Sequence, residues 1–384
     1  MLIRSSVIIL LFLCSCQSND NVKESVVSLG YENNKIVFAN VNFFDGENYF
    51  EKVNLILDGN SIVDITTEEI IPEGFISIDG TGKTIIPPLL NAHVHVWSEE
   101  HLKEAINAGV FALFDMHTTD EGAEYLRNFR GSTGHAYYYS SGPGATVPGG
   151  HGTQYGITVP TINSYISPRQ FVEDRVRNNA DYIKILREPY LPTVTFEQTK
   201  IIIEEAHKNN KLCVAHVSRL ADAMELNSQG IDGFVHIWAD ESISEDQLND
   251  LNKDLFVVPT LYVLMKSLAS QGLYNKFDDV LKDTYKIYKR GIPILAGTDA
   301  PNFNFNYGDD LYMEVELLHK AGIPNIDVLR AATSNIYNSF KLKKFETLKK
   351  GSKANFILIN GNPVERINDI KNIENIWQNG IKIK

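Results

Sequence analysis

Two histidines at alternate positions of an apolar run are the first residues of this sequence that could do chemistry. His93 and His95 stand in the stretch "NAHVHVW" (residues 91–97). Alternate residues of a β-strand project from the same face, so a strand here would direct both imidazoles to one point. Converging imidazoles are typical of a metal site, but two ligands do not complete one.

Four further side chains of suitable chemistry end, or lie within, other short apolar runs. They are Lys184 in "DYIKIL", His216 in "LCVAHVS", His236 in "DGFVHIW" and Asp299 in "ILAGTDAP". Each has an ordinary explanation when taken alone. A histidine at a strand end is more often a satisfied polar residue than a ligand, an aspartate here could cap a helix, and the lysine could extend to solvent. The joint pattern favours a site, because these residue types recur at the same place in successive runs.

The elements that carry these residues alternate between strands and helices from residue 84 to about residue 346. The predicted strands are 84–96, 110–116, 136–141, 182–186, 212–217, 233–237, 255–261 and 292–297, with helices such as 195–210 and 218–230 between them. Alternating strands and helices indicate a parallel sheet, and eight such units predict a (β/α)8 TIM barrel. The carboxyl ends of its strands would meet at one mouth, where the histidines, the lysine and the aspartate would converge.

Both ends of the chain have a different character. Residues 35–83 and 347–384 consist of short β-rich runs separated by turn signals such as "DG" and "NG". Neither segment is long enough to form a convincing core alone. We therefore expect the two segments to pair into one small β-sandwich domain beside the barrel domain, residues 84–346.

Residues 1–34 form a segment that is distinct from both predicted domains. Arg4 precedes an apolar run, 7–13, which is too short to span a membrane and is followed by Cys14-Ser15-Cys16. This stretch resembles a bacterial lipoprotein signal peptide over residues 1–15, with Cys16 as the lipidated first residue and residues 16–34 as a tether. The alternative is an ordinary cleaved signal or a buried start. The lipoprotein interpretation places the protein in the cell envelope, anchored to a membrane only through lipid.

The amino-acid composition limits the classes of molecule that the protein can be expected to bind. The formal net charge is −12 and 43% of the residues are hydrophobic. This acidic net charge argues against nucleic acid and against an anionic membrane surface as partners. A small-molecule substrate fits better, and the oligomeric state is left open.

These residues and their order resemble the amidohydrolase superfamily: an HxH after strand one, a lysine on strand four, histidines ending strands five and six, and an aspartate ending strand eight. The resemblance covers nearly the whole of the expected mature chain, which would begin at Cys16. Within the superfamily, "ADYIKI" and the "GGHG" loop (residues 149–152) are similar to the branch of imidazolonepropionase-like proteins and metal-dependent dipeptidases. Strand one departs from the usual pattern, with "PPLLN" at residues 87–91.

The resemblance implies a binuclear metal site. The implied ligands are His93, His95 and Asp299 for one ion, His216 and His236 for the other, and an N-carboxylated Lys184 between them. Carboxylation by CO2 would turn an ammonium that repels cations into an anionic ligand. Imidazole and carboxylate ligands suit zinc, with manganese or iron as alternatives.

The expected reaction follows from that site. A hydroxide that bridges the two metals would attack a C–N amide, peptide or cyclic amide bond, and Asp299 would carry the proton from the nucleophile to the departing amine. The same ions would also polarise an ester, lactone or phosphoester. A binding lipoprotein without catalysis is a third interpretation, and the complete ligand set argues against it.

Candidate substrate contacts follow strands three, four and seven. The glycine-rich loop 141–156 would let backbone approach a ligand closely. The candidates are His151, Gln154 and Tyr155 from this loop, Arg187 after strand four and Tyr262 after strand seven. His151 could equally stabilise the loop, and Arg187 could form a structural salt bridge. His117, at the end of strand two, also falls near the mouth without a role.

Overall fold

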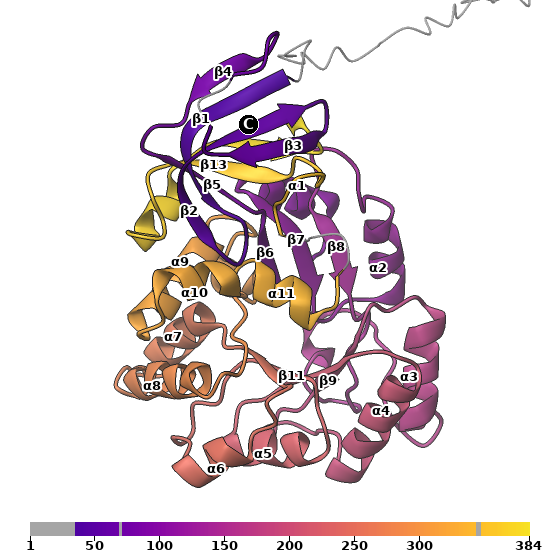
Figure 1. The fold of residues 1–384 in the computed structure, drawn as a ribbon. Coiled ribbons are helices and arrows are strands. Elements are labelled where there is room, and N and C mark those ends of the chain that lie inside the picture. Colours follow the sequence, from indigo (N-terminus) through magenta and orange to yellow (C-terminus); the bar gives the residue numbers. More distant parts are fainter. Residues whose placement is uncertain (1–34, 69–70, 343–346) are drawn as a thin grey trace, which may run out of the picture. The chain divides into compact units, whose positions relative to one another are not determined.

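Strands from the two ends of the chain meet in one mixed sheet (Figure 1) in the structure, a computed structural model that describes residues 35–68, 71–342 and 347–384. The strands are β1 (Lys35–Phe44), β2 (Tyr49–Asp58), β3 (Ser61–Thr66), β4 (Ile76–Asp79), β5 (Lys83–Ile86), β13 (Phe356–Asn360), β14 (Ile373–Gln378) and β15 (Ile381–Lys382). Their order is β15-β14-β13-β5-β1-β2-β3, and β4 pairs with β1. The N-terminal and C-terminal parts join where β13 runs antiparallel to β5, with Leu358 opposite Ile85.

This sheet has its own apolar core. Phe38 on β1 lies edge-on to Phe356 on β13 and to Trp377 on β14, with ring centroids 5.5 and 5.8 Å apart. All three rings are buried. The predicted pairing of the two chain ends is therefore present. The described strands form one continuous sheet rather than two facing ones, so the sandwich remains a prediction.

The middle of the chain folds into two parallel sheets flanked by helices. One has the order β6-β7-β8 and the other β12-β11-β10-β9. Their strands are β6 (Leu89–Val94), β7 (Val110–Asp115), β8 (Tyr137–Ser140), β9 (Ile183–Leu186), β10 (Cys213–His216), β11 (Gly233–Val235) and β12 (Phe256–Val258). Seven of the eight predicted strands are thus found, and the fold is mixed α/β.

Backbone hydrogen bonds outside the strands link the two sheets on both sides. On one side the amide of Ala145 donates to the Lys184 carbonyl at 2.7 Å. On the other side segment 292–300 lies between β12 and β6. There Leu295 N donates to Val257 O and Ala92 N donates to Ala296 O, each at 2.9 Å.

The eighth predicted strand is wrong as a regular strand, because segment 292–300 has only isolated bridges at Ile294 and Ala300. Pro293 lacks an amide donor. A Cβ on Gly297 would lie 2.5 Å from Val258 Cγ1 and 2.9 Å from the backbone nitrogen of His93, so only glycine allows this approach. The irregular segment brings Asp299 against β6.

The predicted first strand, 84–96, is also divided. Pro87 and Pro88 separate β5 from β6, because a proline cannot donate to a strand ladder. β5 belongs to the mixed sheet and β6 to a parallel sheet. One apolar run therefore connects the two parts of the fold.

Helices cover the parallel sheets (Figure 1). They are α1 (Glu99–Asn107), α2 (Asp120–Arg127), α3 (Pro168–Arg177), α4 (Phe196–Lys208), α5 (Leu220–Ser228), α6 (Glu245–Asp250), α7 (Leu261–Ser270), α8 (Lys276–Lys289), α9 (Asp310–Lys320), α10 (Asn325–Ala331) and α11 (Ser334–Ser339), with short 3₁₀ turns η1 (Thr153–Tyr155), η2 (Asn302–Asn304) and η3 (Ile367–Lys371). The predicted helix 195–210 is α4, which a capping box of Thr195 and Gln198 begins.

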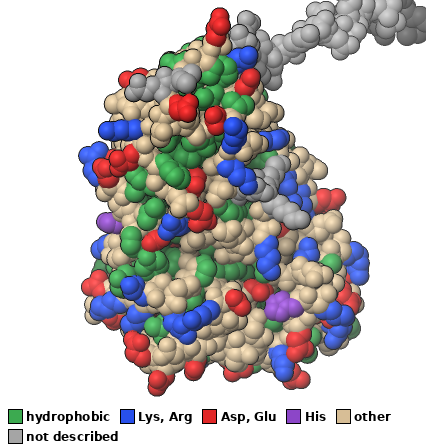
Figure 2. Space-filling model, in the orientation of Figure 1, with side chains coloured by type: hydrophobic (Ala, Val, Ile, Leu, Met, Phe, Trp, Pro, Cys, Tyr) green, Lys and Arg blue, Asp and Glu red, His purple; other side chains and the backbone are tan. Residues whose placement is uncertain are grey.

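The predicted signal peptide, the tether and Cys16 lie outside the described residues. Within the described ranges, no helix is both long and apolar enough to cross a membrane. Figure 2 shows acidic and basic side chains interspersed over the face drawn.

Candidate metal centre and active site

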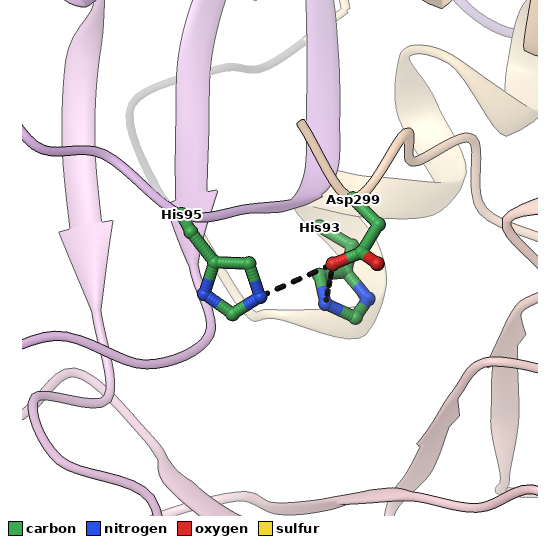
Figure 3. Close-up of side chains that lie close together, drawn as sticks. All are labelled: His93, His95 and Asp299. Atoms are coloured by element: carbon green, nitrogen blue, oxygen red, sulfur yellow. Dashed lines mark ion pairs between the residues drawn. The ribbon is translucent and has the colours of Figure 1, made fainter. Parts of the chain in front are cut away.

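His93, His95 and Asp299 converge at the ends of β6 and of segment 292–300 (Figure 3). Asp299 Oδ1 lies 3.2 Å from His93 Nε2 and 3.1 Å from His95 Nε2. The amide of Asp299 donates to the His93 carbonyl at 2.8 Å, and Asp299 has a φ of 63°. The irregular eighth segment therefore directs the carboxylate at both imidazoles.

This geometry fits one metal ion. Ligand atoms about 2.0–2.1 Å from a tetrahedral zinc ion lie roughly 3.3–3.4 Å from one another, which is close to the two observed separations. Asp299 Oδ1 is buried, and no donor among the described residues forms a hydrogen bond with it. A cation bound between this buried carboxylate oxygen and the two imidazole nitrogens would give the oxygen the partner that it lacks.

Partners outside the centre orient His95. Its Nδ1 donates to the His117 carbonyl at 3.2 Å, so the lone pair of Nε2 faces Asp299. Asp115 lies 4.0 Å from the same Nδ1 and accepts a hydrogen bond from Tyr138 at 2.6 Å. Burial raises the pKa of Asp115 to about 6.

His236, directly after β11, is oriented in the same way. Its Nδ1 lies 2.6 Å from Oγ1 of Thr260, whose hydroxyl donates to the Pro259 carbonyl at 2.8 Å. The hydroxyl oxygen must therefore accept from Nδ1, which leaves the lone pair of Nε2 available for a metal.

His216, the last residue of β10, has Glu188 as its partner. Nε2 lies 3.4 Å from Glu188 Oε2, so a proton on Nε2 would leave Nδ1 as the ligand atom. The ring centroids of His216 and His236 are 4.6 Å apart, and those of His236 and His93 are also 4.6 Å apart. The four strand-end imidazoles thus form a continuous group.

Lys184 on β9 is 1% exposed, and no described residue accepts a hydrogen bond from its Nζ or forms an ion pair with it. Burial lowers its pKa to about 7, although Asp299 acts to raise it. An amine with a pKa of about 7 has a substantial neutral fraction near neutral pH, and carboxylation by CO2 requires the neutral, nucleophilic form. The environment of Lys184 therefore fits the implied modification.

One small cavity, of about 60 Å³, brings most of the predicted residues together. Its lining includes His93, His95, His151, Tyr155, Lys184, His216, His236 and Asp299. His216, His236 and Asp299 also line a neighbouring chamber of about 470 Å³. Six predicted ligands and two predicted substrate contacts therefore share one site.

Three other predicted substrate contacts do not line this cavity. Gln154 is exposed, and its Nε2 lies 3.2 Å from His151 Nδ1. The buried guanidinium of Arg187 lies over the Phe196 ring and 3.4 Å from Asp222, which is the structural alternative that the sequence left open. Tyr262 stacks on Phe305, with ring centroids 4.2 Å apart.

The sequence predicts no role for His117, whereas in the structure its ring binds backbone atoms of the glycine-rich loop. Its Nδ1 accepts from the amide of Gly144 at 2.9 Å, and Nε2 lies 3.2 Å from the Gly152 carbonyl. Both nitrogens thus hold the glycine-rich loop, and burial lowers the pKa of His117 to about 3. The neutral ring anchors the loop that carries His151.

Sequence reasoning missed Asn302, Glu188 and Thr260. Asn302 Nδ2 donates to Asp299 Oδ2 at 2.8 Å and also lines the cavity. The available signal was position, since all three follow a strand or segment end that carries a predicted ligand or a substrate contact. Their residue types are too common in loops for that signal to be specific.

Comparison with known proteins identifies the family of this chain. The model of the amidohydrolase family matches residues 84–383. The chain is 26% identical to an ochratoxinase of Aspergillus niger over an aligned stretch of 291 positions. The match covers 63% of this chain and 59% of that protein, so the chain spans about three fifths of this curated relative.

Solved structures share the fold. A Xaa-Pro dipeptidase with bound methionine superposes with a TM-score of 0.77 at 19% identity, covering 91% of this chain and all of the other. Molinate hydrolase gives 0.76 at 16% identity (91% and 94%), and the A. niger ochratoxinase 0.74 at 20% identity (92% and 96%). Because the family model matches residues 84–383, most of the chain, this protein belongs to the amidohydrolase family of hydrolases.

Proposed function

We propose that this protein is a metal-dependent hydrolase that cleaves a C–N amide, peptide or cyclic amide bond. One observation carries the proposal: all six candidate ligands line one cavity, and outside partners set the tautomers of His95 and His236. The activities named for related proteins, an ochratoxinase and a Xaa-Pro dipeptidase among them, support hydrolysis of amide or peptide bonds.

The proposed site holds two divalent ions, with zinc as the first choice and manganese or iron as alternatives. His93, His95 and Asp299 would hold one, His216 and His236 the other, and a carboxylated Lys184 would contribute to both. When bound, such ions supply Lewis acidity, which polarises a carbonyl and makes water acidic enough to ionise near neutral pH.

Asp299 would move the proton. Its Oδ1 faces the two imidazoles, whereas Oδ2 accepts only one described hydrogen bond, from Asn302 Nδ2. Oδ2 thus keeps a lone pair with which to take the proton of the attacking water and to pass it to the departing amine. One carboxylate can serve as base and then as acid, because the leaving group needs the proton that the nucleophile loses.

His151 would contact the substrate. Its ring lies 4.5 Å from that of His216, and burial lowers its pKa to about 2, so it is neutral. An amide proton of Gln154 directed at Nδ1 would place the imidazole proton on Nε2, where it can donate to a substrate oxygen. Tyr155 lines the same cavity and is a second candidate contact.

We propose the following architecture for this site: a (β/α)8 barrel over residues 84–346 whose eighth member is the irregular segment 292–300, beside a β-sandwich domain of residues 35–83 and 347–384. The sequence further supports a lipid anchor at Cys16 and a place in the cell envelope. Incorporation of labelled palmitate, lost in Cys16→Ser, tests the anchor; unlabelled parent protein would contradict it.

The hydrolytic function is tested by presenting matched amides and esters to the metal-loaded protein. We expect amide hydrolysis that a chelator abolishes and that returns on addition of zinc or manganese. Hydrolysis of esters, lactones or phosphoesters alone would replace the amide proposal with that alternative. Absence of all hydrolysis by a metal-loaded protein would favour a binding role.

A further inference from the structure

The chamber of about 470 Å³ beside the metal site has an apolar wall. Val263, Leu264 and Leu268 of α7 line it, together with Leu273 and Phe303. Phe303 is 49% exposed and Leu273 is 37% exposed, although both side chains are apolar. Large apolar side chains left open to solvent at the edge of a cavity are typical of a surface that binds an apolar ligand.

The polar wall of this chamber is acidic. Glu188 and Asp240 line it, and Lys276 is its single lysine among the described lining residues. Asp240 Oδ1 accepts from the amide of Leu220 at 3.0 Å, which fixes the carboxylate in place. Lys276 Nζ donates to the carbonyl of Asp240 at 3.0 Å, so the ammonium is already held by backbone.

No arginine is among the described residues that line the chamber. The neighbouring loops supply two, Arg187 and Arg219, but both are directed to Asp222, at 3.4 and 3.7 Å. A guanidinium is the usual partner for a substrate carboxylate, because its two parallel N–H donors match the carboxylate oxygens. The chamber therefore lacks the guanidinium that usually binds a carboxylate. It also places the negative charges of Glu188 and Asp240 where a substrate carboxylate would enter.

We infer that the group entering this chamber is the amine side of the substrate, and that it is an apolar group without a carboxylate. This inference rests on the proposed amide hydrolysis, in which Asp299 protonates the departing amine. Asp299 and Asn302 border the chamber as well as the metal site, so an amine protonated there extends into the chamber. The favoured substrates are therefore N-acyl derivatives of apolar amines rather than N-acyl amino acids or dipeptides.

A pair of substrates that differ only in a carboxylate tests the inference. The metal-loaded protein would be given N-acetyl-2-phenylethylamine and N-acetyl-L-phenylalanine, and the same pair with longer acyl groups. We expect kcat/KM to be at least about tenfold higher for the amine that lacks the carboxylate, a ratio that corresponds to about 1.4 kcal/mol, because like charges facing each other are unfavourable. Equal values, or a preference for the amino acid, would overturn the inference while leaving amide hydrolysis intact. Hydrolysis of other amides but of neither member of the pair would overturn this inference alone. Absence of hydrolysis of every amide tested would overturn the proposed function and this inference with it.

The substitution Asp240→Asn removes the negative charge of this side chain and keeps its shape, so it tests the effect of the charge alone. The asparagine Oδ1 can still accept from Leu220, so only the negative charge is removed. We expect kcat/KM for the phenylalanine derivative to rise several-fold relative to that for the phenylethylamine derivative. Glu241→Gln is the control, because Glu241 neighbours Asp240 but does not line the chamber. A substrate preference that responds equally to both variants, or to neither, would contradict the inference.

Discussion

Glu314 caps helix α7 in place of Thr260. Thr260 stands at the N-cap position, where a threonine side chain ordinarily accepts from the first turn, but its hydroxyl is engaged with His236 and makes no cap bond. The Glu314 carboxyl, on α9, accepts instead from the amides of Leu261 and Tyr262 at 2.9 and 2.8 Å. The fold thus frees one hydroxyl to orient a candidate metal ligand.

Replacing Thr260 tests this orientation. Thr260→Val keeps the shape but removes the oxygen that accepts from His236 Nδ1. We expect the affinity for metal to fall about 10–100-fold, the usual cost of losing a partner behind a ligand. Competition with a chelator measures it. Thr260→Ser keeps the hydroxyl and should retain most of the affinity, and equal loss in both variants would assign Thr260 a packing role.

The pH dependence of the free energy of unfolding tests the raised pKa of the buried Glu314 carboxyl. Burial raises its pKa to about 8 in the folded protein, from an ordinary value of 4.5. Because the folded state holds the proton more tightly, the stabilisation is complete below pH 4.5 and is lost as the pH rises to 8. The free energy of unfolding should therefore fall relative to that of Glu314→Gln, by at most about 1.4 kcal/mol for each pH unit in this window.

Urea unfolding of both proteins at pH 5, 6.5 and 8 measures this difference. A gap between parent and Glu314→Gln that stays constant over the three values would show that the carboxyl ionises at its ordinary pKa.

Several features of the site follow from sequence because they are local. A strand with histidines at alternate positions must direct both to one face, and the carboxyl ends of parallel strands share one mouth. The pattern therefore predicts the convergence of His93, His95, Lys184, His216 and His236, which the structure places around one cavity.

The remaining features depend on contacts that no local pattern encodes. Glu314 is 53 positions from Leu261, the first residue of the helix that it caps, and His117 binds backbone atoms of a loop, which leave no mark on residue type. The irregular path of 292–300 depends on the fit of Gly297 against β6 and β12. The apolar residues of this segment do not by themselves predict this irregular path.

Two glycines of one loop test the role of His117. Gly152 has a φ of 94°, and a Cβ there would lie 2.6 Å from Leu186 and 2.9 Å from His117 Nε2. Gly152→Ala should displace the loop and raise KM about tenfold or more, since a small misplacement of a positioning group can cost 10²-fold. Gly156 also has a positive φ, 74°, but its Cβ would meet open space. Gly156→Ala should cost only about 1 kcal/mol of stability. Similar kinetics in the two variants would contradict a positioning role for this loop.

Asp299→Asn tests the proton transfer. The amide keeps an oxygen that faces His93 and His95, so metal content should be largely retained. It cannot accept the proton, and we expect kcat to fall about 10²–10⁴-fold. Single-turnover rates on a metal-loaded sample measure the step directly. Turnover at the parental rate would show that another group moves the proton.

The central claim is that a binuclear metal site is built around Lys184, and elemental analysis of metal per chain tests it most directly. The comparison is between the parent, Lys184→Ala and Lys282→Ala, an exposed lysine whose partner is Asp279 at 2.8 Å. Circular dichroism and thermal unfolding establish that each variant is folded. We expect about two metal ions per chain in the parent and in Lys282→Ala, and one or fewer in Lys184→Ala. One ion or fewer in the parent, unchanged by loss of Lys184, would contradict it.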